Sequence, residues 1–387
     1  MSHEFPPKTT GPLSGIVVAD FSRVLAGPYT TLLLADMGAT VIKVEGPSGD
    51  DSRTWRPPAA RGEASYFQAV NRNKYSVKLD LADANDLATA RDIARNADIF
   101  VHNFKPGSIE KFGLGYDDVK ELRPDIVYAH ITGFGKVGKG RELPGYDVLV
   151  QGMAGLMDMN GDPQEDPVRS GVSIFDLTTG MITAFGIVSA LRHRDLTGEG
   201  QLIDNNLLAN AIFTMSNQYQ AVATTDTPIT RAGKEHATIY PYNAFPTGNG
   251  ELIIVGANNG QFIKLCNVLE IPNIAQDPRF DTAEKRNVNR NELRPILEKA
   301  LSTRSKDEWF RLLTEAGLPC APVQSVKEGL ELAPTLGIEP TWQTEDPDSL
   351  PTVRNSLTMS KTPPTYRKEP PAIGEDTDTI KEWLNNL

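Results

Sequence analysis

The sequence has few of the residues that build disulfide or metal sites. Only two cysteines, Cys266 and Cys320, occur among the 387 residues, and both lie in apolar stretches. This argues against a disulfide framework and against a cysteine-based zinc site. The five histidines show no metal-ligand spacing, and Walker A, H-E-x-x-H and EF-hand patterns are missing. We therefore predict two buried thiols in a reducing cytosol and no bound metal.

The sequence also lacks a basic excess and long apolar runs. It has 39 Lys and Arg against 50 Asp and Glu, a net charge of −11, whereas a general nucleic-acid binder is usually basic. The longest apolar runs, at 184–191 and 252–257, are too short to span a bilayer, and the first residues lack the pattern of a signal peptide. We expect a soluble, cytoplasmic protein that binds neither nucleic acid nor membrane.

What the sequence does contain is an alternation of strand and helix patterns. The first half predicts strands at 15–20, 40–45, 75–81, 98–103 and 125–132, with helices at 27–38 and 84–94. This pattern is typical of an α/β fold with a doubly wound parallel sheet. Ligands in such sheets bind beyond the carboxyl ends of the strands. The loops to inspect are therefore 23–27, 45–49, 103–107 and 133–140.

The pattern of predicted strands and helices changes after about residue 222. A long helix at 176–194, a strand at 201–204 and another helix precede the change, and two strands around a Gly-Asn-Gly turn follow it. Three helices then come near 260–269, 291–301 and 306–316, before a Pro-rich stretch and a last amphipathic helix at 376–387. We predict a large domain over 1–222, a smaller α+β domain over 223–318, and a segment over 319–387 that returns to complete the large domain.

The segment Gly133–Gly138 matches G-x-G-x-x-G after a predicted strand, which is the pattern of a dinucleotide-binding turn. In that turn the glycines must open a helix whose N-terminus faces the pyrophosphate. Here Pro144 and Gly145 stand where the helix should be. A single match of this kind is weak, and we do not predict binding of NAD.

Asp176 is the most informative carboxylate. It follows Ile174 and Phe175 and directly precedes the long helix, where aspartate is a favoured N-cap. A carboxylate held ionised at a helix start in an apolar setting can also attack an activated acyl group as a nucleophile. Both interpretations can hold together.

Tyr146 and Asp147 lie where a turn enters another apolar helix, so they are either a helix cap with an aromatic staple or functional residues. Several cations lie in or near the strand-end loops, where an acidic protein could use them to hold a phosphorylated cofactor. They are Arg23, Lys43, Arg72, Lys74, Lys105 and Lys111.

Eight motifs, in order, make the whole chain resemble the class III CoA-transferases, the formyl-CoA transferase or carnitine CoA-transferase type. They are GPLSG at 11–15, DFSRVLAGP at 20–28, GATVIKVE at 38–45, NRNK at 71–74, NFKPG at 103–107, GYD at 145–147, DLTTG at 176–180 and PPAIGED at 370–376. The resemblance implies a large Rossmann-like domain built from both chain ends, a small domain, and two subunits interlocked as a homodimer.

The resemblance also implies a mechanism. Asp176 matches the catalytic aspartate of this family, which attacks an acyl-CoA thioester and becomes an aspartyl-CoA thioester, on which a carboxylic acid acceptor repeats the steps in reverse. Coenzyme A is the expected substrate, held along the strand-end loops. We expect ten residues to bind the cofactor. Three are Arg23 and the GYD residues Tyr146 and Asp147. The other seven match cofactor-contacting positions of the family: Leu25, Ala26, Leu79, Asn103, Phe104, Lys105 and Lys111. Lys111 is suited to a phosphate.

Two positions depart from formyl-CoA transferase. That family member has a glutamine where this chain has Leu25, and a four-glycine loop where this chain has Ala257-Asn-Asn259 between Gly256 and Gly260. This chain therefore need not shield its reaction intermediates from water in the way that formyl-CoA transferase does. Asn258, Asn259 and Gly260 could still form a lid over the site.

The family also contains α-methylacyl-CoA racemases, which use the histidine of a Gly-His-Asp motif. This chain has Tyr146 there, and a phenol with a reference pKa near 10 is a poor base near neutral pH, so transfer is favoured over racemisation. A non-catalytic acyl-CoA-binding protein is a third alternative, but it should have lost Asp176.

The motifs RVLAGP, FGLGYDD and YPYNAF are most similar to the succinate-hydroxymethylglutarate CoA-transferase group, which implies a dicarboxylate acceptor. A second carboxylate calls for a cation. The candidates are Arg53, Arg56, Arg169 and His236.

Overall fold

The computed structural model describes residues 5–60, 62–226, 228–231, 233–236, 238–346 and 348–387. The chain forms two compact units, which are treated separately below. The larger comprises residues 1–155, 169–227 and 339–387, and the smaller comprises 156–168 and 228–338. The chain thus returns to the larger unit at Glu339, where the sequence predicted 319, and a short segment before the predicted boundary at 223 belongs to the smaller unit.

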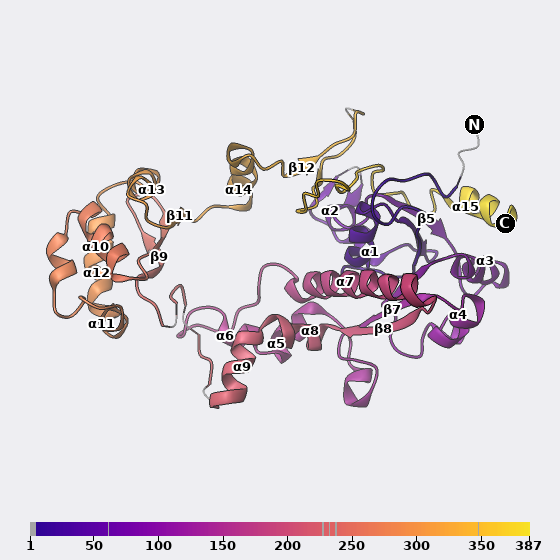
Figure 1. The fold of residues 1–387 in the computed structure, drawn as a ribbon, viewed down its shortest axis with the longest axis horizontal. Helices are drawn as coiled ribbons and strands as arrows, with labels where there is room; N and C mark the ends of the chain where they lie inside the picture. Colours follow the sequence, from indigo (N-terminus) through magenta and orange to yellow (C-terminus); the bar gives the residue numbers. More distant parts are fainter. Residues whose placement is uncertain (1–4, 61, 227, 232, 237, 347) are drawn as a thin grey trace. The chain divides into compact units, whose positions relative to one another are not determined.

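The larger unit is built on a six-stranded sheet in which all neighbouring strands are parallel. Its order is β5-β2-β1-β6-β7-β8, and β5, β7 and β8 are labelled in Figure 1. The strands are β1 (Val17–Asp20), β2 (Thr40–Glu45), β5 (Lys74–Lys78), β6 (Ile99–His102), β7 (Val127–Thr132) and β8 (Gln201–Asn206). The predicted α/β class with a parallel sheet is confirmed. Because the order reverses between β1 and β6, the loops after these two strands flank the crevice where ligands bind in such folds.

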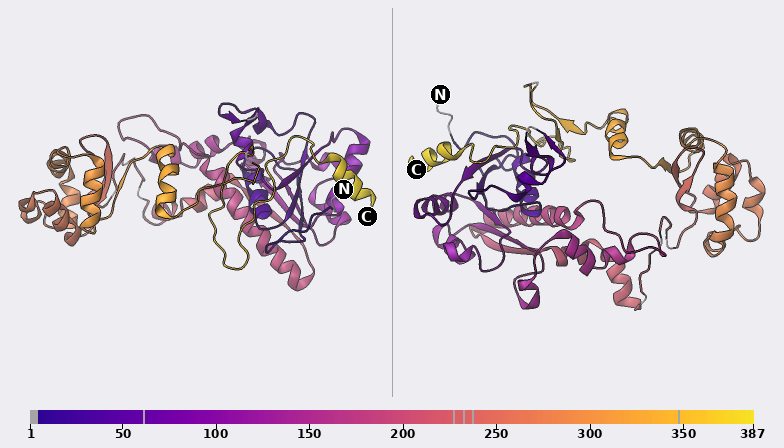
Figure 2. Two further views of the ribbon diagram at one scale, coloured as in Figure 1. Left: turned by 90° about the horizontal axis from the view of Figure 1, so that it is seen from above. Right: turned by 180° about the vertical axis from the view of Figure 1, so that it is seen from behind.

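Helices cover both faces of this sheet. Alternate strand residues such as Val18, Ile99 and Val127 pack with α1 (Ala26–Asp36) and α7 (Ile174–Thr197). The opposite face packs with α3 (Ala84–Arg95), α4 (Tyr116–Leu122) and α15 (Thr377–Asn385). The start of the described chain meets the last helix there: the Phe5 ring contacts Trp383 of α15, which is the yellow helix at the C-terminus in both views of Figure 2. Because helices cover both faces of the sheet, the central strands β2, β1, β6 and β7 are buried along their whole length.

The long helix α7 is the central helix of the larger unit. A side chain at Gly180 would meet the Ala26 carbonyl oxygen at 2.9 Å, so this glycine allows α1 and α7 to approach closely. By length and composition alone, α7 could cross a membrane. The search for uninterrupted apolar runs in the sequence did not identify this helix, because polar residues interrupt it. One of its faces is buried on the sheet, and Met181, Phe185 and Val188 are exposed on another.

Shorter elements complete the larger unit. They are β3 (Ala59–Ala60), β4 (Glu63–Ala64), α2 (Ser65–Gln68), α5 (Asp147–Met153), α8 (Leu207–Thr214), α9 (Ser216–Thr225), β12 (Thr341–Trp342) and β13 (Thr352–Val353), with 3-10 helices η1 (Asp51–Thr54), η2 (Glu110–Phe112) and η3 (Gly138–Glu142). The sequence did not predict the β12-β13 hairpin, which lies in the Pro-rich return segment.

The smaller unit has a three-stranded antiparallel sheet of order β11-β10-β9. Its elements are α6 (Leu156–Met159), β9 (Tyr242–Pro246), β10 (Glu251–Val255), α10 (Asn259–Val268), α11 (Ala283–Val288), α12 (Arg290–Leu301), α13 (Lys306–Glu315), β11 (Cys320–Pro322) and α14 (Val326–Leu332), with η4 (Pro272–Gln276) and η5 (Ala333–Leu336). The two strands predicted around the Gly-Asn-Gly turn are β9 and β10, whereas α11, β11 and α14 were not predicted. Cys266 is buried as expected, but Cys320 is only half-buried at the edge of the sheet, so the prediction of two buried thiols is right for one.

Candidate active site

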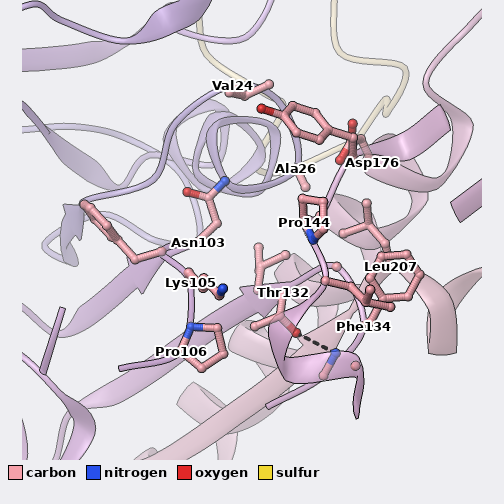
Figure 3. Close-up of a pocket in the computed structure, with 18 of the residues that line it drawn as sticks. Val24, Ala26, Asn103, Lys105, Pro106, Thr132, Phe134, Pro144, Asp176 and Leu207 are labelled. Atoms are coloured by element: carbon pink, nitrogen blue, oxygen red, sulfur yellow. Dashed lines mark hydrogen bonds between the residues drawn. The ribbon is translucent and has the colours of Figure 1, made fainter. Parts of the chain in front are cut away.

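A cavity of about 280 Å³ opens where the strand order of the large sheet reverses. The loops after β1, β6 and β7 line it, together with the first turn of α7. Figure 3 shows Asp176 on one side of the cavity and Asn103, Lys105 and Pro106 on the other. The lining includes eight of the predicted site residues: Arg23, Leu25, Ala26, Asn103, Phe104, Lys105, Tyr146 and Asp176.

The loop after β1 is held in a strained backbone conformation beside this cavity. Val24 has a φ of +72°, which is rare for a β-branched residue. The Asp50 carboxylate accepts a hydrogen bond from the Val24 N–H at 3.1 Å, and the Asn103 amide both donates to and accepts from the Arg23 backbone. Asp50 is itself paired with the buried Lys43 ammonium at 2.9 Å. These contacts fix the backbone that leads into α1, and strain of this kind is typical of functional sites.

Asp176 lies inside α7 rather than at its cap. The helix begins at Ile174, and its N-cap is Ser173, so the prediction that Asp176 is the N-cap is wrong. The Asp176 side chain lines the cavity, largely withdrawn from solvent. Burial, and secondly the negative charge of Asp147, raise the pKa of Asp176 from 3.8 to about 7. This carboxyl group is therefore more basic, and more nucleophilic when ionised, than an ordinary aspartate.

Asp147 lies behind the cavity wall and is only 6% exposed. It begins α5, but its carboxylate accepts hydrogen bonds from the backbone N–H groups of Phe175 at 2.8 Å and Asp176 at 3.2 Å. It therefore caps α7, not the helix to which it belongs. Tyr146, the N-cap of α5, is exposed and lines the cavity.

A second cavity of about 250 Å³ adjoins the first and shares Arg23, Asp51 and Phe104 with it. Leu79 lines this second cavity, as does Phe112. Lys111 is exposed and lines neither cavity, although it neighbours Phe112. Of the predicted cofactor-binding residues, Lys111 and Asp147 are thus the two that the structure keeps out of the cavity walls.

Three of the six cations that the sequence offered for phosphate binding are buried in ion pairs. Lys43 pairs with Asp50, Arg72 with Asp36, and Lys74 with Asp20, and all six side chains are almost fully enclosed. Arg53, proposed for the acceptor, is likewise bound to Glu45 by two hydrogen bonds. Each of these cations is paired with a buried carboxylate, so its role is structural and it is not free to bind a ligand.

Two site residues were missed by reasoning from the sequence. Arg141 lines the first cavity from η3, and the cluster of basic residues in the loop after β7 could have revealed it. Tyr66 packs against the same buried cluster as Leu177 of α7, and the negative charge of Asp176 acts on its phenol. Burial, and the nearby charges, raise the pKa of Tyr66 to about 12, so it stays neutral. No sequence signal pointed to Tyr66, because its role depends on the meeting of α2 and α7.

Comparison with known proteins identifies the family. The profile of "CoA-transferase family III" matches residues 13–377. The chain belongs to this family. It is 38% identical to a succinate–glutarate CoA-transferase of Agrobacterium fabrum, over 98% of both chains. It is 36% identical to the human succinyl-CoA:glutarate CoA-transferase, over 96% of this chain and 86% of that one. A crystal structure of a CAIB/BAIF family protein from Brucella suis superposes with a TM-score of 0.91 at 35% identity, covering 97% of this chain and 100% of that one.

The chain is therefore a class III CoA-transferase, as the motifs implied. In the transferase, the G-x-G-x-x-G segment leads into the 3-10 helix η3 and opens no α-helix, as predicted. The predicted lid residues form the start of α10, where the Asn258 side chain accepts a hydrogen bond from the Gln261 N–H. Within the described residues, no group of three or more His, Cys, Asp or Glu side chains could hold a metal ion.

Proposed function

We propose that this transferase moves CoA from an acyl-CoA to a dicarboxylic acid through covalent intermediates on Asp176. The observation that carries the proposal is the position of Asp176: a carboxyl group of raised pKa in the cavity where the strand order reverses. The names of the relatives support the acceptor class, since they act on succinate, glutarate and, in Haloarcula hispanica, mesaconate.

The proposed chemistry exchanges two activated bonds. An Asp176 oxygen attacks the thioester carbonyl carbon, the C–S bond breaks, and CoA leaves as a thiolate, which gives an acyl-aspartyl anhydride. The thiolate attacks the aspartyl carbonyl carbon, the donor acid leaves as a carboxylate, and an aspartyl-CoA thioester remains. The acceptor carboxylate then repeats both steps in reverse. The activation of the thioester is kept throughout, because no intermediate is released to water.

The two adjoining cavities offer CoA a continuous path to Asp176. Arg23, Lys105 and Arg141 line the first cavity and are half-exposed. Each is engaged only in a surface ion pair, with Asp51 or Glu142, and such weak pairs can be exchanged for contacts with phosphates. Leu79 and Phe112 give the second cavity an apolar wall suited to a base. We propose that the acyl thioester lies at Asp176 and the nucleotide extends toward the second cavity. Racemisation is disfavoured, since Tyr146 stands where racemases use a histidine.

Trapping the acyl-enzyme tests this function. Incubation with succinyl-CoA followed by hydroxylamine should leave a hydroxamate on the peptide that carries Asp176, detected by mass spectrometry. Because the ionised carboxyl group is the nucleophile and its pKa is about 7, the initial rate of adduct formation should fall about tenfold per pH unit below pH 7. Absence of an adduct with several acyl-CoA donors, or an adduct on another residue, would contradict the mechanism. Deuterium uptake at the α-carbon of a 2-methylacyl-CoA would instead favour the racemase.

We propose further that the transferase is a homodimer in the cytoplasm. Large apolar side chains are exposed on α7 and α8 of the larger unit, among them Met181, Phe185 and Phe213, and a dimer would bury them. Sedimentation velocity should give twice the mass of one chain. Phe185→Lys should shift the protein toward monomers, whereas Val326→Lys, at an exposed residue of the smaller unit, should not. A monomeric wild-type protein at micromolar concentration would overturn this proposal.

A further inference from the structure

The start of α7 is capped by another part of the chain. Ser173 is the N-cap by position, but its side chain makes no capping hydrogen bond. The first N–H groups of a helix need acceptors, and a local serine usually supplies one. Here Asp147 accepts from the N–H groups of Phe175 and Asp176. An acceptor 28 residues away along the chain thus replaces the local cap.

A second side chain holds Asp147 in place. Gln151, one turn later on α5 and fully buried, donates its amide N–H to the other carboxylate oxygen of Asp147. The side-chain amide oxygen of Gln151 accepts a hydrogen bond from the Ser170 N–H at 2.8 Å. Asp147 and Gln151, which we call the α7 clamp, therefore fix both the first turn of α7 and the chain that leads into it.

The clamp has a chemical consequence for Asp176. A carboxylate in the first turn of a helix normally gains N–H donors and the favourable dipole, which make it less basic and less nucleophilic. Here Asp147 takes those N–H groups, and no described group donates a hydrogen bond to the Asp176 carboxylate. The two acidic side chains therefore divide between them the tasks of capping and reacting, as paired carboxyl groups do in other active sites.

We propose that Asp147, held by Gln151, is a positioning residue for the transfer reaction: it occupies the N–H groups of the first turn of α7 and so keeps the Asp176 carboxylate unbonded, oriented into the cavity and nucleophilic. This inference rests on the proposed function of Asp176. It reassigns Asp147 from CoA binding, the role predicted from the sequence, to control of the nucleophile.

The charged and titratable groups around Asp176 permit a pH test. Asp147 on α5 is the charge that acts on it, and Tyr66 on α2 stays neutral below pH 12. The cavity itself adds the cations Arg23, Lys105 and Arg141 and the phenol of Tyr146. The other elements packed on α7 carry few titratable residues: Tyr29 and Asp36 on α1, Tyr128 and His130 on β7, Asp204 on β8, and none on α8. None of these residues contributes to the raised pKa of Asp176.

The test compares three variants in the full-length enzyme. Asp147→Asn keeps an oxygen that can accept from the two N–H groups, but it removes the negative charge. It also places an NH₂ group opposite the NH₂ group of Gln151, so the hydrogen bond between these two side chains is lost. Asp147→Asn with Gln151→Glu restores that hydrogen bond, because the carboxylate introduced at position 151 can accept from the new amide, and it returns a negative charge nearby. Thr183→Val is the control: it removes a buried hydrogen bond from Asn205 to the middle of α7 and leaves the first turn alone.

We expect Asp147→Asn to lower kcat about 10- to 100-fold with little change in the KM for acyl-CoA. The fall in the rate of adduct formation at acid pH, which we call the acid limb, should move toward lower pH by at least about half a unit. The double variant should recover at least about tenfold of kcat and move the limb back. Thr183→Val should keep the wild-type limb. Thermal melts establish that each variant is folded.

The outcomes separate the two proposals. If the wild-type enzyme forms no adduct on Asp176, the proposed function fails. If it does, and folded Asp147→Asn keeps the wild-type kcat and acid limb, the positioning role is overturned. It is also overturned if kcat falls with an unmoved limb, or if neither clamp variant folds, because Asp147 is then a structural residue only.

Discussion

Asp176→Asn is expected to lower the rate of CoA transfer by at least about 10³-fold, because an amide cannot attack the thioester and form the anhydride. The side chains that line the rest of the cavity are unchanged, so the affinity for CoA should stay within about threefold of the wild type. Steady-state kinetics and calorimetric titration with CoA measure the two quantities. An Asp176→Ala enzyme that transfers CoA at the wild-type rate would refute covalent catalysis by this residue.

The same substitution should raise stability at neutral and alkaline pH. The pKa of Asp176 is about 7 in the folded chain and near 3.9 when unfolded, so ionised Asp176 destabilises the fold. This cost is absent below pH 4 and grows to its full size above pH 7. Asp176→Asn should therefore raise the free energy of unfolding by on the order of 2 kcal/mol at pH 8 and not at pH 4. Equal melting temperatures of variant and wild type at pH 8 would contradict the raised pKa.

Asp36→Ala is expected to cost about 3–5 kcal/mol of stability, because it leaves the buried Arg72 guanidinium without its counter-ion. The Asp36 carboxylate accepts two hydrogen bonds from Arg72, one from Asn73 at 2.9 Å and one from Asn355 of the return segment at 3.1 Å. Arg72 also donates to the Val353 carbonyl oxygen. The variant should thus loosen the attachment of the C-terminal return segment and lower the melting temperature of the larger unit by about 10 °C.

An exposed ion pair is the matched control for that prediction. Arg311 and Glu315 on α13 pair one turn apart, and both side chains are more than half exposed. Glu315→Ala should change stability by less than about 0.5 kcal/mol, since water already solvates both charges. Comparable losses in the two variants by calorimetry would show that burial does not determine the strength of these pairs.

Local patterning predicted the sheet of the larger unit well. The strand Thr40–Glu45 has the predicted bounds, and the other four strands predicted in the first half are present with ends shifted by at most three residues. Apolar β-branched runs separated by polar loops carry this information locally. The start of α7 was two residues off because Asp176 looked like a local cap, whereas the acceptor for its N–H came from a distant segment.

The sequence by itself determined the α/β class, the strand-end loops that line the cavity, the family motifs and Asp176 as the candidate nucleophile. Only the tertiary structure decided which charged residues are available for chemistry. Lys43, Arg72 and Lys74 look like phosphate ligands in the sequence, yet each is enclosed with a carboxylate from another element. The role of Asp147 also arises from a meeting of α5 and α7. Burial and pairing between distant segments set these roles, and neither is encoded in the spacing of residues along one segment.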